Sequence, residues 1–133
     1  MNPYLKFMGK EDHLQHAVME YLKRQYPKVL AFHVPNEAKR SSFERFKAKY
    51  LGVLPGVSDV IIIHNGEVLA IELKIKPNKA TKNQQDFLEK INQAGFIGII
   101  CYDFLATKRH IDYFLKAMPQ IPYRKTEKKK VMI

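Results

Sequence analysis

The sequence predicts a single α/β domain in which helices flank a central mixed β-sheet, with its elements in the order αβ(α)ββαβα. Three observations support this prediction. The chain has 133 residues, of which 46% are apolar, so it can form one domain with a substantial core. Segments with helical periodicity alternate with short apolar runs. Two of these runs are joined by Asn65-Gly66, the strongest short-range signal for a β-hairpin.

The N-terminal part predicts one helix and one strand. We expect residues 1–9 to form a loose arm. Residues 10–25 predict a helix, because apolar side chains recur at helical spacing until Pro27 ends the pattern. The run Val-Leu-Ala-Phe-His-Val over residues 29–34 predicts the first strand.

A short helix is predicted after this strand. Ser41 and Glu44 have the spacing of a capping box, in which each side chain accepts a hydrogen bond from the other residue's backbone N–H. Gly52 and Pro55-Gly56 end the helix. Its apolar side chains are expected to point into the core: Phe43, Phe46, Tyr50 and Leu51.

The register of the hairpin follows from its turn. A two-residue Asn-Gly turn pairs His64 with Glu67, and counting outwards then places Asp59 opposite Glu72. Side chains that are directly opposed have Cβ atoms about 4.5–5.5 Å apart. Lys74 points to the same face as Glu72, because side chains alternate along a strand. Both faces are largely apolar, so we expect strands that are buried on both sides.

The C-terminal part predicts two further helices and one strand. Residues 81–94 predict a helix that Thr81 caps and Gly95 ends. The apolar run over residues 96–102 predicts an interior strand, parallel to the second hairpin strand and joined to it by a right-handed crossover. Residues 104–118 predict a last amphipathic helix.

The charge of the chain indicates an anionic partner. The formal net charge is +10, which favours nucleic acid first and an acidic membrane surface second. A soluble basic protein without such a partner is the alternative. We expect one domain over residues 1–118 and a basic tail over residues 119–133, which adds loose phosphate contacts.

Several classes of protein are disfavoured by what the sequence lacks. Cys101 is the single cysteine, which excludes an internal disulfide, and its apolar surroundings indicate a core thiol rather than a nucleophile. The start lacks the apolar region of a signal peptide, and no run approaches the roughly 18 apolar residues of a membrane span. There is no Gly-rich phosphate loop. We therefore expect a cytoplasmic protein with no membrane partner and no nucleotide cofactor.

The opposed acids Asp59 and Glu72 are the feature that points to chemistry. Two ionised carboxylates about 5 Å apart repel by roughly 3 kcal/mol at an effective dielectric constant near 20. The pair therefore needs a cation, or one carboxyl must keep its proton. Lys74 supplies one positive charge, and a divalent metal would supply two more. Hard oxygen ligands of this kind suit Mg²⁺ or Mn²⁺.

Asp59 followed by Glu72-x-Lys74 is the pattern D…E-x-K, which resembles the PD-(D/E)xK nuclease superfamily and its restriction-endonuclease-like fold. Further motifs resemble one branch, the VRR-NUC (virus-type replication-repair) nucleases, over about residues 10–103. In Pro55-Gly56-Val57-Ser58-Asp59, Ser58 stands where that family often has proline. The other motifs, in the order of the family, are Glu11-x-x-Leu14-Gln15, Val34-Pro35-Asn36-Glu37, Leu51-Gly52, Ile71-Glu72-Leu73-Lys74, Thr81-x-x-Gln84 and Ala94-Gly95.

The resemblance implies a role for each residue of the site. Asp59 and Glu72 would hold the metal, helped by the main-chain carbonyl of Leu73. Lys74 would orient or deprotonate the attacking water and offset charge on the scissile phosphate. Glu11 would bind the metal or its waters from the first helix.

The resemblance also implies a stand-alone phage or bacterial endonuclease. Such an enzyme would act as a homodimer on branched or duplex DNA, including four-way junctions, in replication, recombination or repair. Gln84 would support the site from the helix after the hairpin. Apart from the resemblance, the basic side chains next to the proposed site predict a surface that contacts phosphates, and simple solvated charge is the alternative. The predicted residues are Asn36, Lys39, Arg40, Arg45, Lys47, Lys49 and Lys76.

Structural interpretations of these residues stay open. Asp59, Glu72 and Lys74 could form a structural ion cluster, although a buried ion pair is a poor stabiliser. Glu11 could be a solvated residue that the helix dipole favours. Gln84 could be a surface glutamine.

Two other functions also stay open. A non-catalytic DNA-binding module could keep the fold, but it would have no need for the Asp59/Glu72/Lys74 set. An RNA-directed endonuclease would usually rely on histidine without metal, and His33 and His64 look like strand-end residues instead.

Overall fold

The structure is a computed structural model that describes residues 2–35 and 41–117. The helices are η1 (Pro3–Phe7, a 3₁₀ helix), α1 (Lys10–Gln25), α2 (Ser42–Leu51), α3 (Lys82–Gln93) and α4 (Phe104–Ala117). The strands are β1 (Leu30–His33), β2 (Val60–His64), β3 (Glu67–Leu73) and β4 (Ile97–Cys101). The predicted element order is confirmed. The proposed end of the domain at residue 118 and the basic tail lie outside the described residues.

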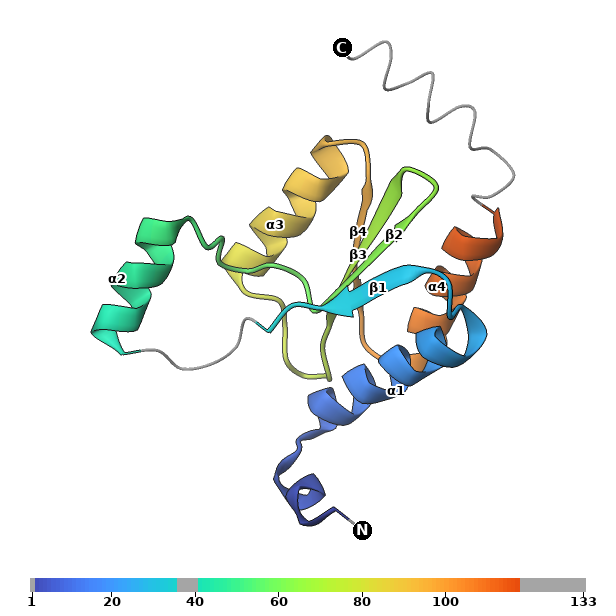
Figure 1. Cartoon of the computed structure of the whole chain (residues 1–133), viewed down its shortest axis with the longest axis horizontal. Coiled ribbons are helices and arrows are strands. Elements are labelled where there is room, and N and C mark those ends of the chain that lie inside the picture. Colours follow the sequence, from blue (N-terminus) through green and yellow to red (C-terminus); the bar gives the residue numbers. More distant parts are fainter. Residues whose placement is uncertain (1, 36–40, 118–133) are drawn as a thin grey trace.

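The four strands form one mixed sheet in the order β1-β2-β3-β4 (Figure 1). β2 is antiparallel to β1 and β3, whereas β4 is parallel to β3. The hairpin has the predicted register, with His64 opposite Glu67. Asn65 (φ 50°) and Gly66 (φ 75°) adopt the left-handed conformation that a type I′ turn requires.

Helices cover both faces of the sheet, as predicted (Figure 1). α3 packs on one face, against β3 and β4. Gly98 in β4 permits this close packing, because a Cβ atom there would lie 3.0 Å from the main-chain oxygen of Leu88. α1 and α4 cover the other face and enclose the core. The buried core residues are Leu14, Val18, Leu22, Val60, Ile62, Leu69, Ile71, Leu73, Cys101, Ile111, Phe114 and Leu115.

Two strands are less enclosed than the sequence predicts. β4 is an edge strand rather than an interior one, and its residues before Cys101 are only half-buried. β2 is not buried on both sides, because Ile63 is 39% exposed. The cause is the same in both cases: apolar residues reveal a strand, but they do not reveal which neighbours cover it.

α2 departs most from the prediction. The expected capping box is present, with the Glu44 N–H donating to Ser41 Oγ (3.2 Å), and Gly52 (φ 88°) ends the helix. None of its residues is buried, however, and α2 stands apart from the sheet (Figure 1). The amphipathic pattern fixes which side of the helix is apolar but not what covers that side. The residues expected in the core are therefore exposed: Phe43, Phe46, Tyr50 and Leu51.

The N-terminal arm is more ordered than expected. Residues Pro3–Phe7 form η1, and the Tyr4 N–H donates to Asn2 Oδ1 (2.8 Å), which caps this short helix. Within the described residues, no helix is both long and apolar enough to cross a membrane.

Candidate active site

The loop before β2 brings Asp59 to the start of that strand. Gly56 has a left-handed φ of 82°, and a Cβ atom there would lie 2.4 Å from the backbone of Asn83. The loop therefore packs directly on the first turn of α3. The Asp59 carbonyl accepts a hydrogen bond from the Val34 N–H (3.1 Å), which ties the loop to the end of β1.

Asp59 and Glu72 are buried together, as the hairpin register predicts. Asp59 is 6% exposed and Glu72 is 1% exposed. One Asp59 oxygen, Oδ2, accepts a hydrogen bond from the Leu73 N–H (2.8 Å). Burial, then the charge of Asp59 and a hydrogen bond with it, raise the pKa of Glu72 to about 9. Glu72 Oε1 is buried and has no hydrogen-bond partner among residues 2–35 and 41–117. The pair is thus close and incompletely satisfied.

Lys74 lies beside the pair on the same face. Its Nζ atom is 3.8 Å from Glu72 Oε2, and its side chain is only 12% exposed. The ammonium group lowers the pKa of Glu72, but burial and Asp59 outweigh it. One lysine therefore does not neutralise the two acids.

Glu11, in the first turn of α1, lies near enough to Asp59 and Lys74 for their charges to affect its pKa. Burial is the main factor that raises its pKa, Asp59 adds to that effect, and Lys74 opposes it. A hydrogen bond with the Ile75 backbone also lowers the pKa of Glu11. The structure thus places Glu11 near the acid pair rather than in open solvent.

Gln84 has a local role that accounts for part of its side chain. Its Oε1 atom accepts a hydrogen bond from the Thr81 N–H (2.8 Å), and its own N–H donates to Thr81 Oγ1 (3.2 Å). This capping box fixes the start of α3 against the loop at Gly56. A direct role for Gln84 in the chemistry stays a prediction.

The predicted phosphate contacts are only partly described. Asn36, Lys39 and Arg40 lie outside the described residues. The other four side chains are exposed, with Arg45, Lys47 and Lys49 on α2 and Lys76 just after β3. Lys76 Nζ lies 5.7 Å from the ring centroid of Tyr102.

His33 is a supporting residue that the sequence did not reveal. Its Nδ1 atom lies 2.7 Å from the Asp59 carbonyl oxygen, the same oxygen that the Val34 N–H contacts. The contact arises because β1 pairs with β2, with His33 opposite Val60. No short-range signal indicates a pairing between segments so far apart in the sequence.

The donor atoms of the site fit a hard divalent cation. Within residues 2–35 and 41–117, no three side chains of His, Cys, Asp or Glu converge as a ready-made metal cage. Mg²⁺ does not need one, because it usually binds through one or two carboxylates and keeps several waters. Asp59 has one oxygen beyond the one that Leu73 contacts, and Glu72 Oε1 lacks a partner. Both acids therefore offer an oxygen for a cation.

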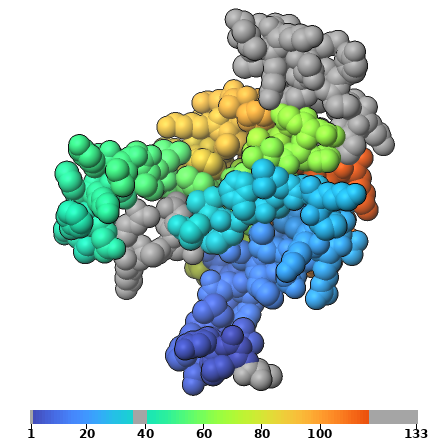
Figure 2. Space-filling model, viewed as in Figure 1, coloured from blue at the N-terminus to red at the C-terminus, as the bar shows by residue number. Residues whose placement is uncertain are grey.

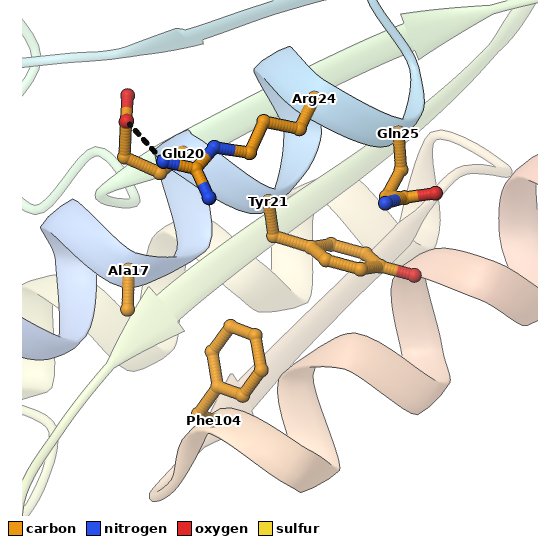
Figure 3. A pocket seen from close by; sticks show the side chains of 6 residues that line it. All are labelled: Ala17, Glu20, Tyr21, Arg24, Gln25 and Phe104. Atoms are coloured by element: carbon orange, nitrogen blue, oxygen red, sulfur yellow. Dashed lines mark ion pairs between the residues drawn. The ribbon is translucent and has the colours of Figure 1, made fainter.

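A surface hollow of about 280 Å³ lies elsewhere on α1 and carries no part of this cluster (Figure 3). The Tyr21 and Phe104 rings meet edge to face there, at 5.8 Å between centroids. Glu20 and Arg24 form an exposed ion pair at its rim. Glu20 is the only acid among the residues that line this hollow, so the Asp59–Glu72 pair is the stronger candidate for the chemistry.

Comparison with known proteins decides the family. The VRR-NUC domain model matches residues 9–103, which include the whole acid cluster. The chain belongs to the VRR-NUC domain family. This family is of the PD-(D/E)xK kind, so a nuclease-type function and a DNA substrate follow from membership.

A solved structure of this family has the same fold. It is a VRR_NUC domain protein with a TM-score of 0.67 and 26% sequence identity, and the match covers 82% of this chain and 90% of that one. Comparison with curated proteins gives no match. The resemblance drawn from the motifs is therefore confirmed by both sequence and fold.

Proposed function

We propose that this VRR-NUC protein is an endonuclease that uses Mg²⁺ or Mn²⁺ to hydrolyse phosphodiester bonds in DNA. The observation that supports this most is the buried pair Asp59–Glu72, which a single lysine leaves short of positive charge. A structural ion cluster would be expected to satisfy its oxygens, and Glu72 Oε1 is not satisfied.

The acid pair would hold the cation. Leu73 fixes one Asp59 oxygen through its N–H and so orients the other. The Leu73 carbonyl is proposed as a further ligand. Glu72, whose pKa is raised, would lose its proton on binding a cation. A divalent cation held there supplies Lewis-acid stabilisation of the phosphate oxygen and makes a bound water more acidic.

Lys74 would act on the attacking water and the phosphate. Its ammonium group is close to Glu72 and mostly shielded from solvent, so a charge on the phosphate would attract it strongly. Glu11 would orient waters at the edge of the site, and Gln84 would support the site from the start of α3.

The substrate contacts would lie on the basic side chains near the site. Arg45, Lys47 and Lys49 on α2, with Lys76 after β3, would neutralise phosphates. Asn36, Lys39 and Arg40 are assigned to the same surface from the sequence.

The proposed working form is a homodimer that cuts branched DNA such as four-way junctions, in the cytoplasm of a bacterial or phage-infected cell. A two-fold dimer would place two sites on paired strands. The protein would thereby serve DNA replication, recombination or repair.

The test is a cleavage assay on duplex, flap, single-stranded and four-way DNA, each with and without Mn²⁺. We expect cleavage only with the metal, and most on the branched substrates. RNA of matched sequence serves as the control for the sugar. DNA binding without cleavage of any substrate would instead identify a non-catalytic binding module.

A further inference from the structure

The apolar side of α2 has no cover in the described part of the molecule. Its side chains are largely exposed, with Phe43 at 69%, Phe46 at 63%, Tyr50 at 79% and Leu51 at 66%. These four residues are called the α2 face below. Figure 2 shows α2 as a lobe at the left side of the molecule. Its capping box and its glycine end indicate a well-formed helix rather than a frayed segment.

The α2 face is large enough to require an explanation. The Phe46 and Tyr50 rings stack at 5.8 Å between centroids and make a flat apolar plate. Aromatic side chains present about 150–250 Å² each, so the α2 face exposes roughly 500 Å². That value is within the range of the largest apolar patch on a typical monomer, about 300–600 Å², and such patches are often functional.

A second uncovered apolar surface lies on the sheet. α3 covers β3 and β4, but no helix of the described residues packs on the β1–β2 half of the same sheet face. Leu30 is 58% exposed there, and Phe32 and Ile63 are each 39% exposed. These three residues are called the open sheet half. An α/β sheet face is normally covered by helices, so this half lacks a layer.

We propose that the α2 face docks on the open sheet half of a second copy of this chain. Each copy offers one apolar helix and one sheet surface that no described helix covers. In a two-fold dimer, the α2 face of each copy would cover the open sheet half of the other, so no such surface is left for a third copy. Together the two surfaces expose roughly 800 Å² per copy, which is about what each partner contributes to a standard specific interface. The inference rests on the proposed homodimer and names the surface that forms it.

A second copy fits these surfaces better than nucleic acid does. Stacking of bases would use the rings of Phe43, Phe46 and Tyr50. It would leave the aliphatic side chains Leu51 and Leu30 exposed, and it would not supply the missing layer of the sheet. DNA stacking is therefore an outcome of the test rather than the proposal.

The test is sedimentation equilibrium of the full chain at micromolar concentration. We expect wild type to be a dimer, and we expect the double variant Phe46→Glu/Tyr50→Glu to raise the dissociation constant roughly 30-fold or more. Tyr113→Glu is the matched control, because Tyr113 is 70% exposed on α4. These side chains are exposed in one copy, so circular dichroism should show an unchanged fold.

The open sheet half is tested with its own variant. Leu30→Lys should weaken the dimer as the α2 variant does, and a normal dimer in Leu30→Lys would show that the α2 face does not dock on the open sheet half. A monomeric wild type, or an α2 variant that dimerises like Tyr113→Glu, would overturn the docking proposal. If wild type is monomeric and only the α2 variant loses affinity for single-stranded DNA, the α2 face binds nucleic acid instead.

Failure of the docking proposal can be distinguished from failure of the proposed nuclease function. Asp59→Ala should dimerise like wild type, because Asp59 is not part of either surface. Phe46→Glu/Tyr50→Glu should still bind Mn²⁺. Loss of dimerisation with retained metal binding supports the docking surface, whether or not any DNA substrate is cut.

Discussion

The domain contains two carboxylate sites, at Asp112 and at Asp59–Glu72, whose surroundings have opposite effects on ionisation. At Asp112, burial opposes ionisation, but hydrogen bonds from Tyr21, Tyr26 and Lys108 outweigh it and lower the pKa of Asp112 to about 2. The Tyr26 hydroxyl lies 2.6 Å from Asp112 Oδ1, and Lys108 Nζ lies 3.1 Å from Oδ2. Lys108 compensates the charge of this carboxylate, and the two tyrosine hydroxyls donate hydrogen bonds to it. The tyrosines lie on and just after α1, so Asp112 also joins α1 to α4.

The Asp59–Glu72 pair lacks such matching. Burial and Asp59 raise the pKa of Glu72 to about 9, and Glu72 Oε1 has no hydrogen-bond partner within the part of the chain that the structure describes. Buried polar groups in a fold are normally satisfied, whereas strongly perturbed groups gather at functional sites. The contrast is between a carboxylate whose hydrogen bonds stabilise the fold and a pair to which the proposed function assigns a cation.

The largest expected effect is on cleavage. Asp59→Ala and Lys74→Ala should lower the rate of Mn²⁺-dependent DNA cleavage by roughly 10³-fold or more. Asp59→Ala removes a proposed ligand of the cation, and Lys74→Ala removes the group proposed to act on the water and the phosphate. Asp112→Asn is the control and should retain most activity in single-turnover assays. Equal loss in Asp112→Asn would show that the two clusters do not differ in function.

The next effect is on metal binding and its pH dependence. Burial and Asp59 raise the pKa of Glu72 to about 9 in the metal-free protein, so we expect a cation that binds there to displace a proton. The affinity for Mn²⁺ should therefore rise from pH 6 to pH 9, at most about tenfold per pH unit. Calorimetry in two buffers should detect proton release on binding. Glu72→Gln should abolish both signals, and pH-independent affinity would contradict this assignment.

The stability of the fold should depend on Asp112. Its pKa falls from 3.8 unfolded to about 2 folded, so it stabilises the fold above about pH 4 and that contribution is lost as the pH falls towards 2. The difference corresponds to about 2 kcal/mol. Urea denaturation of Asp112→Asn at pH 6 should show a loss of this size. It should also show a weaker pH dependence below pH 4 than wild type.

The smallest effect concerns two buried hydroxyls. Ser58 Oγ is buried and has no hydrogen-bond partner in the described part of the chain, whereas Thr107 Oγ1 donates to the Asp103 carbonyl (2.7 Å). Ser58→Ala should leave stability unchanged or raise it by up to about 1 kcal/mol, because it removes an unsatisfied group. Thr107→Ala should lower stability by about 1 kcal/mol. Thermal unfolding of the pair measures the difference, and a clear loss in Ser58→Ala would point to a partner for its hydroxyl.

Short-range signals predicted much of the fold and the acid cluster. The Asn65-Gly66 turn set the hairpin register and hence the meeting of Asp59 with Glu72. Helical periodicity and Pro27 gave the bounds of α1. These features depend on neighbours within a few residues, so the sequence displays them directly.

Contacts between distant segments could not be predicted in the same way. Asp112 meets Tyr21 across 91 positions of the chain, and His33 meets Asp59 across 26. The prediction that the apolar side of α2 lies in the core was wrong for a related reason, because periodicity describes one helix and not its surroundings. Assignment of roles at the site depended on the family resemblance, because proximity alone does not separate a base from an electrostatic clamp.

The most direct test is a crystal of this protein soaked in Mn²⁺. The proposed function predicts anomalous density between the carboxylates of Asp59 and Glu72, with Glu72 Oε1 as a ligand. Absence of density there at saturating Mn²⁺ would contradict a metal-dependent site.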